Sequence, residues 1–361
     1  MKRITLSALL MTLFLLLSCG SGSSKAEDPK TLFLTSIANL GKGFLDVFTS
    51  LSDMITGALG IKADTKKSDI GNYFTSIEKT MNTVKKKLQE EVAANGNYLK
   101  IKEVVEHFIT NTLDKIAAGA KTAASGVTGG ASIAEVVKAN AVGVTTDAES
   151  IKNLVKGIKT IVDLVLKEGD PKADKTKPVD ADKKDIGKLF GAKNDSADGG
   201  AEDKHVAAVS ASIGAVTGAD ILKAIASANA DATKDGKVKD ATDAAALALT
   251  KGTSTANDDQ LGDSAKKDAV IAAGIALRAM AKDGKFIVKD TAANKTEAEA
   301  AKGVAANAVG KTLSTLIIAI RNTVDSGLKT ISAALATVTQ EDKSVEATTP
   351  ADTATVGQNS K

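Results

Sequence analysis

The chain has 361 residues and carries 47 Lys and Arg against 44 Asp and Glu, which gives a formal net charge of +3 at pH 7. This near balance excludes the concentrated positive charge of a nucleic-acid-binding protein. Aromatic residues make up only 3% of the chain and Trp is absent. We therefore expect thin helix–helix contacts rather than a thick globular core. The helical spacing of apolar residues along the chain predicts an all-α fold class, an elongated helical bundle.

The first 19 residues have the pattern of a bacterial lipoprotein signal. Two basic residues precede an apolar run over 4–17, which ends at Ser18 and Cys19, the one cysteine of the chain. The run is too short to span a bilayer comfortably and is typical of a signal peptide. We expect cleavage between Ser18 and Cys19, with Cys19 becoming an N-acyl, S-diacylglycerol cysteine. An ordinary secretory signal with a free thiol is the less favoured interpretation.

Residues 19–28 form a short polar tether, and amphipathic stripes follow it. Apolar residues recur at alternating steps of four and three, which is typical of helices packed in a bundle. The spacing predicts helices over 29–59, 68–95 and 101–116, and a last long helix with its stripe over 304–338. Packed together, the first and last of these helices would form a stalk that starts at the lipid. From residue 341 to 361 the sequence predicts a disordered polar tail.

The middle of the chain contains shorter helical segments and polar breaks. Ser132 to Glu135 and Thr146 to Glu149 have the pattern of capping boxes. Residues 169–204 are predicted to form a long polar excursion with one apolar patch at Ile186, Leu189 and Phe190. Further helical segments are predicted at 205–216, 219–230, 240–251 and 264–282, separated by polar turns such as 252–263. Phe286 to Val288 is predicted to be a short strand that pairs near Val238.

Residues that could carry catalysis or hold a metal are few. The two histidines, His107 and His205, are both expected at the surface, and a Cys/His zinc site is excluded by the single cysteine. Residues 231–242 begin like a calcium loop, but Thr242 stands where the bidentate Glu belongs, so a turn is favoured. The pair Asp258 and Asp259 is interpreted as solvated surface. We therefore expect neither an enzyme nor a bound metal or cofactor.

Two stretches indicate a family. Residues 265–290, AKKDAVIAAGIALRAMAKDGKFIVKD, closely resemble a framework segment of the variable large proteins, the variable major lipoproteins of Borrelia spirochaetes, which are related to the surface antigen VlsE. The C-terminal stretch TLIIAIRNTVDSGLKTI and the leader with Cys19 are similar as well. The resemblance extends over essentially the whole chain.

The resemblance implies one elongated, mainly helical domain over 29–340, with exposed loops between about 123 and 263. It also implies a lipoprotein of the cell outer membrane, recognised by host antibodies, which acts in immune evasion by antigenic variation. The alternative is an adhesin that binds host glycans, cells or serum proteins through the Lys-rich loops around 169–204. Whether the chain forms a homodimer stays open.

Overall fold

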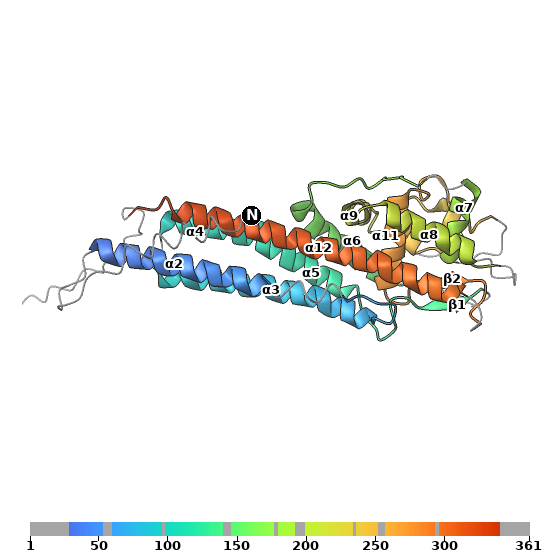
Figure 1. The fold of residues 1–361 in the computed structure, drawn as a ribbon, viewed down its shortest axis with the longest axis horizontal. Helices are drawn as coiled ribbons and strands as arrows, with labels where there is room; N and C mark the ends of the chain where they lie inside the picture. Colours follow the sequence, from blue (N-terminus) through green and yellow to red (C-terminus); the bar gives the residue numbers. More distant parts are fainter. Residues whose placement is uncertain are drawn as a thin grey trace, which may run out of the picture.

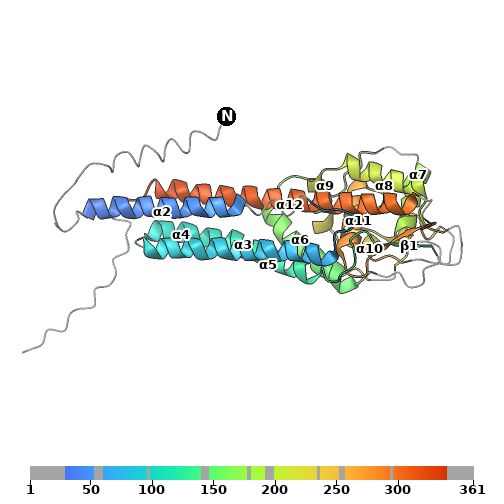
Figure 2. The same ribbon diagram turned by 60° about the horizontal axis from the view of Figure 1, so that its bottom comes forward.

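The computed structural model describes residues 29–52, 60–95, 98–139, 146–176, 180–191, 199–233, 236–251, 257–292 and 296–339. The molecule is elongated (Figures 1 and 2). The described chain starts at Pro29 and stops near Thr339 at the same end, which we call the narrow end. The short strands β1 and β2 lie at the opposite end, which we call the wide end.

Long helices run along the molecule between these two ends. They are α2 (Pro29–Ser52), α3 (Lys67–Ala94), α4 (Leu99–Phe108), the π-helical turn η2 (Ile109–Leu113), α5 (Asp114–Ser125) and α12 (Glu297–Leu335). In α3 the buried side chains follow the predicted stripe from Ile70 to Val92. The predicted mainly helical fold is therefore confirmed, because the steps of four and three place these apolar side chains on one face.

Helix α12 has 39 residues and is therefore about 58 Å long, so it connects the two ends of the molecule. Its stripe includes Leu313, Leu316 and Ile320, none of which exposes any side-chain surface. In length and composition this helix would suit a membrane span, yet more than half of its most apolar window is buried inside the protein. This burial is what the core helix of a bundle shows.

The wide end is built from shorter helices around the first half of α12. They are α6 (Ala148–Val165), α7 (Asp180–Asp185), the 3₁₀ turn η3 (Ile186–Leu189), α8 (Asp203–Ala215), α9 (Gly218–Ala226), the 3₁₀ turn η4 (Val238–Asp240), α10 (Ala244–Ala248) and α11 (Asp268–Met280). Every residue of α11 is buried. The apolar segment 271–280, inside the helix predicted at 264–282, is therefore packed within the wide end.

The strand predicted at Phe286–Val288 (β2) exists, but its predicted partner was wrong. It pairs in parallel with β1 (Val136–Lys138), in a register that sets Val136 against Phe286. Val238 lies in η4 instead. The capping box predicted at Ser132 is also wrong, because Ser132 forms an antiparallel bridge with Lys66 and the chain then enters β1.

Helix α6 begins close to its predicted start, although its cap differs by one residue. The carboxylate of Asp147 accepts a hydrogen bond from the backbone N–H of Ser150, at 2.7 Å. Thr146, the predicted cap, instead donates its hydroxyl to the carbonyl oxygen of Ala248, at 2.9 Å. A buried hydroxyl needs such a partner.

Helices α5 and α6 cross very closely. A Cβ atom added to Gly157 would lie 2.5 Å from the carbonyl oxygen of Gly119, and one added to Gly119 would lie 2.8 Å from the carbonyl oxygen of Gly157. Each glycine therefore leaves room for the backbone of the other helix. This contact places α6, and the wide end with it, against the bundle.

Candidate functional site

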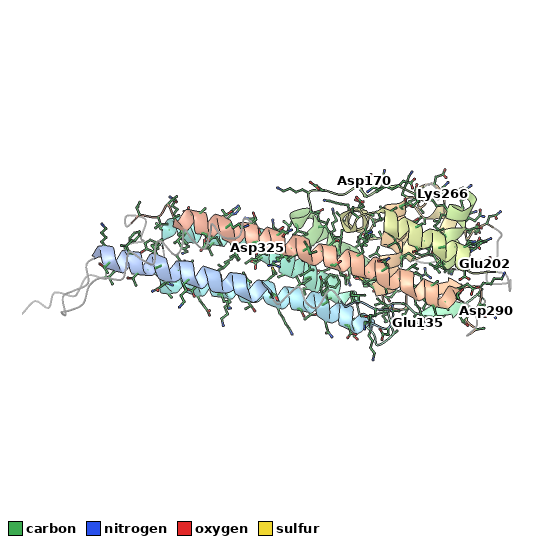
Figure 3. All side chains as sticks on the ribbon, in the orientation of Figure 1. Glu135, Asp170, Glu202, Lys266, Asp290 and Asp325 are labelled. Carbon is green, nitrogen blue, oxygen red and sulfur yellow. The ribbon has the colours of Figure 1, made fainter. Side chains whose placement is uncertain are left out.

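The surface that the sequence singled out, with alternating Lys and Asp from 170 onward, lies at the wide end of the molecule. Figure 3 shows Asp170 and Lys266 there, with Glu202 and Asp290 further along the same end. Residues 170–176 cross the N-terminal ends of α9 and α11, and we call this segment the charged strap. Its attachments decide which of its side chains remain available at the surface.

Asp220, in the first turn of α9, holds the beginning of the strap. Its carboxylate accepts hydrogen bonds from the backbone N–H of Asp170 at 2.8 Å and from that of Thr217 at 2.9 Å. The ammonium of Lys175 lies 3.2 Å from the same carboxylate. A negative charge at a helix N-terminus is favourable. The buried carboxylate of Asp220 therefore completes the capping box of α9, whose N-cap is Thr217, and fixes the strap to this helix.

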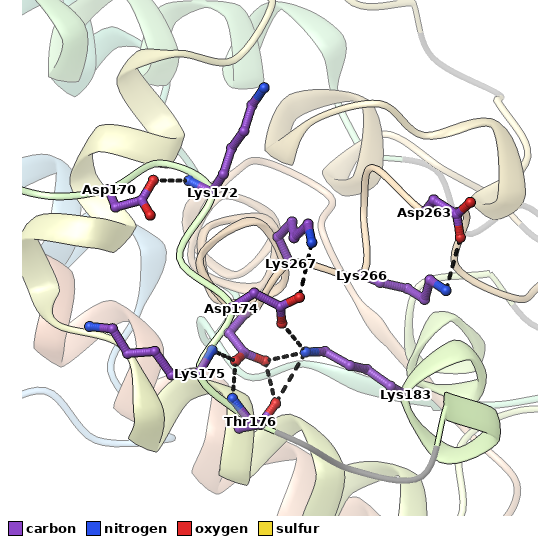
Figure 4. Close-up of polar contacts among 10 residues, drawn as sticks. Asp170, Lys172, Asp174, Lys175, Thr176, Lys183, Asp263, Lys266 and Lys267 are labelled. Atoms are coloured by element: carbon purple, nitrogen blue, oxygen red, sulfur yellow. Dashed lines mark hydrogen bonds and ion pairs between the residues drawn. The ribbon is translucent and has the colours of Figure 1, made fainter.

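Asp268, the first residue of α11, holds the end of the strap at Lys175 and Thr176, which are labelled in Figure 4. Its side chain is fully buried and accepts hydrogen bonds from the backbone N–H groups of Lys175 and Thr176, both at 2.7 Å. The ammonium of Lys183 lies 2.8 Å from Asp268 and also contacts Asp174, which Lys267 reaches at 3.0 Å. Carboxylates and lysines of the strap, of α7 and of the start of α11 thus neutralise one another.

The acidic groups of this network stay ionised. Burial by itself would raise the pKa of Asp220, but the hydrogen bonds from Asp170, Thr217 and Lys175 outweigh it and lower that pKa to about 2. The pKa of Asp268 is also below its usual range, because the hydrogen bonds from Lys183 and Thr176 outweigh the effect of burial. The network is therefore a set of compensated charges at neutral pH.

The polar excursion predicted over 169–204 is only partly a solvent-exposed loop. Ala173 points inward with 3% exposure, and the apolar patch at Ile186, Leu189 and Phe190 is fully buried. The run over 167–170 is exposed, and so is Lys172, whose ammonium points away from the network in Figure 4. The exposed side chains of this surface thus belong to a segment whose backbone is held in place by the buried carboxylates Asp220 and Asp268.

Two residue sets expected in solvent are buried. His205 is 1% exposed, and its Nδ1 accepts a hydrogen bond from the backbone N–H of Glu202 at 2.9 Å. Burial, with a smaller contribution from Lys188, lowers the pKa of His205. Asp258 is 1% exposed because Lys237 and Lys239 cover its carboxylate, and Asp259 is 8% exposed. The sequence could not predict this burial, because the groups that shield these side chains from solvent come from other parts of the chain.

Two buried cations escaped the sequence analysis. Lys67 is 1% exposed and donates to three backbone carbonyls, while Arg278 is fully buried and donates to the carbonyls of Lys285, Ala248 and Thr250. Arg278 also lies over the ring of Phe190. Its position inside the otherwise apolar run AVIAAGIALRAMA is the one local signal of such a role.

The remaining predicted site residues divide into two groups. His107 is exposed, as predicted. Ser18 and Cys19 lie outside the described residues, so their cleavage and lipidation stay predictions. Among the residues that the structure describes, His, Cys, Asp and Glu side chains form no group suited to hold a metal ion.

Comparisons with known proteins agree on one family. The chain is 59% identical to variable large protein 4 of Borrelia hermsii, in an alignment that covers 99% of this chain and 100% of that protein. It is 58% identical to variable large protein 17 of the same organism, in an alignment that covers 100% of this chain and 99% of that protein. The crystal structure of the Lyme disease variable surface antigen VlsE of Borrelia burgdorferi superposes with a TM-score of 0.69 at 34% identity, covering 83% of this chain and 98% of that chain. The model of the Borrelia lipoprotein family matches residues 44–335, and the chain belongs to this family.

Proposed function

We propose that this protein is a lipid-anchored antigen of the outer membrane surface that serves immune evasion by antigenic variation, without catalysis. In this proposal Cys19 carries the lipid and the narrow end faces the membrane. The wide end then faces outward, where host antibodies meet it. Switching to another member of the family would replace this face while the buried framework stays the same.

The observation that carries the proposal is the way the wide end is constructed. Its shape is fixed from inside, by the buried carboxylates Asp220 and Asp268 and by the fully buried helix α11. Exposed side chains such as Glu168 and Lys172 take no part in these buried contacts. Surface changes of this kind usually alter stability by less than about 0.5 kcal/mol. An antigen that must change its face and keep its fold needs this separation.

The spread among relatives supports the same conclusion. Variable large protein 19 of Borrelia hermsii is 41% identical over 92% of this chain, and variable large protein 12 of that organism is 31% identical over 96%. These two relatives therefore align with this chain over nearly its whole length while fewer than half of the aligned residues are identical. Such divergence is what repeated replacement of an antigenic surface would produce.

The test is a double charge reversal at two exposed residues, Glu168→Lys just before the charged strap and Lys172→Glu within it. We expect antibodies raised against the folded wild-type wide end to lose binding, while the melting curve stays unchanged. The matched control, Asp268→Asn, removes a buried carboxylate and should lower the melting temperature. If the double reversal unfolds the protein, or if every such antibody binds it as well as wild type, the proposal fails.

The adhesin alternative predicts a different result in the same variant. Loss of binding to host cells or glycans, with antibody recognition kept, would favour it. The ion pairs of Lys175, Lys183 and Lys267 with Asp220, Asp174 and Asp268 weigh against a coherent basic patch here. We therefore place antigenic variation first. Lipidation is tested separately, by the mass of the mature N-terminal peptide and by release of a Cys19→Ala variant from membranes.

A further inference from the structure

The narrow end exposes apolar side chains where a soluble bundle would be expected to carry polar ones. Within the described residues, the large apolar side chains with the greatest exposure are Leu32 at 49%, Leu34 at 39%, Leu99 at 54% and Ile318 at 50%. The first three belong to the opening turns of α2 and α4, which start at the narrow end (Figures 1 and 2). Scattered single apolar residues need no explanation, but a cluster does.

A ring contact brings the two helix starts that carry these leucines together. The rings of Phe33 and Tyr98 meet edge to face, with 5.7 Å between their centroids. Phe33 stands between Leu32 and Leu34, and Tyr98 directly precedes Leu99. The three exposed leucines are therefore the sequence neighbours of one aromatic contact, which joins α2 to α4. We call Leu32, Leu34 and Leu99 the apolar tip.

The end of α12 reaches the same place and meets a positive charge carried by α4. The ammonium of Lys100 lies 3.5 Å from the carbonyl oxygen of Thr337, just beyond α12. Lys30 belongs to the first turn of α2, and no acidic residue occurs in the sequence from Pro29 to Phe44. Leucines flanked by lysines are the composition of surfaces that lie in the headgroup region of a bilayer, where the lysine ammonium groups remain at the phosphates.

The covalent chain limits where the membrane can be. Cys19 precedes Pro29 by ten residues, and ten residues reach at most about 35 Å, whatever their conformation. Helix α12 alone is about 58 Å long. A lipid on Cys19 therefore keeps the narrow end near the bilayer, and it cannot bring the bilayer to the wide end while the long axis stands upright.

We propose that the apolar tip inserts among the lipid headgroups of the membrane that holds the anchor, and so forms a second attachment beside the lipid. This inference rests on the proposed lipidation of Cys19. One flexible tether would leave the long axis free to tilt, whereas two attachments fix the narrow end on the surface. The wide end is then held away from the bilayer, where antibodies can approach it.

The experiment uses the full mature lipoprotein in vesicles that contain phosphatidylglycerol. Variants Leu32→Cys, Leu99→Cys and Ile318→Cys each receive a polarity-sensitive fluorophore, and the thioether of a lipidated Cys19 does not react with it. Ile318 is the matched control, because it is equally exposed but lies about 25 Å along α12 from Leu335. Quenching is measured with aqueous iodide and with lipids that carry a nitroxide at the headgroup.

We expect the fluorophores at positions 32 and 99 to lose most of their iodide quenching on vesicles and to gain quenching by the nitroxide lipids. The fluorophore at position 318 should keep its iodide quenching. If the protein is lipidated but the fluorophores at 32 and 99 show the same quenching as the fluorophore at 318, the proposed insertion of the apolar tip is wrong. The proposed lipid anchor would not be affected by that result. The mass of the N-terminal peptide shows independently whether Cys19 carries lipid. An unlipidated Cys19 would refute both the proposed anchor and the proposed insertion of the apolar tip.

Discussion

The ammonium nitrogen of Lys67 lies 2.8 Å from the carbonyl oxygen of Ala279, and this contact joins the first residue of α3 to the C-terminal end of α11. The same ammonium donates to the carbonyls of Ala281 and Gly284. The carbonyls at a helix C-terminus lack partners within the helix and attract positive charge. A buried cation therefore connects the bundle to the framework of the wide end.

Replacing Lys67 by Met should lower the free energy of unfolding by about 2–4 kcal/mol, because three carbonyls lose a buried hydrogen-bond donor. Urea unfolding followed by circular dichroism measures this loss. Lys62→Met is the matched control, since Lys62 is exposed, and its effect should stay within about 0.5 kcal/mol. Equal effects of the two changes would show that the contact with α11 contributes no stability.

Asp220 should make the protein sensitive to acid. Its pKa is about 2 in the folded state against 3.8 ordinarily, so the folded state favours the ionised form. The stability from this group is present above about pH 4 and is lost as the pH falls toward 2, by about 2 kcal/mol in total. Asp220→Asn should therefore destabilise the protein at pH 7 and flatten the fall in stability between pH 4 and pH 2.

The control for this pH profile is Asp163→Asn, because Asp163 forms an exposed ion pair with Lys159. Exposed pairs contribute little, so this variant should follow the wild-type curve. An Asp220→Asn variant that also follows the wild-type curve would show that Asp220 is not held by the hydrogen bonds described above.

Two isoleucines of α12 have the same side chain but differ in burial, so the same substitution at both positions tests the effect of burial alone. Ile320 is fully buried and Ile318 is 50% exposed. Ile320→Asp should cost several kcal/mol, because it places an unpaired charge in the core, whereas Ile318→Asp should change stability by less than about 0.5 kcal/mol. Thermal melts of both variants test this, and a wild-type melt for Ile320→Asp would contradict the packing of α12.

The crossing of α5 and α6 depends on Gly157. A Cβ atom there would lie 2.4 Å from the backbone nitrogen of Ala123, so Gly157→Ala should destabilise by about 1–3 kcal/mol despite the better helix propensity of Ala. Gly303, in α12, has no atom within 4 Å of such a Cβ. Gly303→Ala should instead stabilise by about 0.5–1 kcal/mol. Chemical denaturation should give opposite signs, and equal signs would contradict the close crossing.

Sequence periodicity was sufficient for the long helices and insufficient for contacts between distant segments. The stripe from Ile70 to Val92 predicts α3 because one face of that helix is buried over its whole length. The pairing of Val136 with Phe286 joins residues 150 positions apart, and no local pattern indicates which short apolar segment a strand will meet. Ser132 fits a capping box in sequence, but its bridge with Lys66 decides its structure.

The candidate site shows the same limit. The sequence after residue 169 alternates Lys and Asp. It did not indicate that Asp268, almost a hundred residues later, would be buried beneath the strap and bind Thr176 and Lys183. Burial of His205 was missed for a similar reason, because helices from other parts of the chain cover it.

In the proposed orientation the wide end faces outward from the cell and the narrow end faces the membrane. Antibodies to residues 167–176 and to residues 98–107 test it most directly, because both segments expose side chains in the isolated fold. On intact cells we expect the first antibody to bind and the second to bind only after the membrane is dissolved in detergent. Equal binding of both to intact cells, or binding of the second alone, would contradict the account.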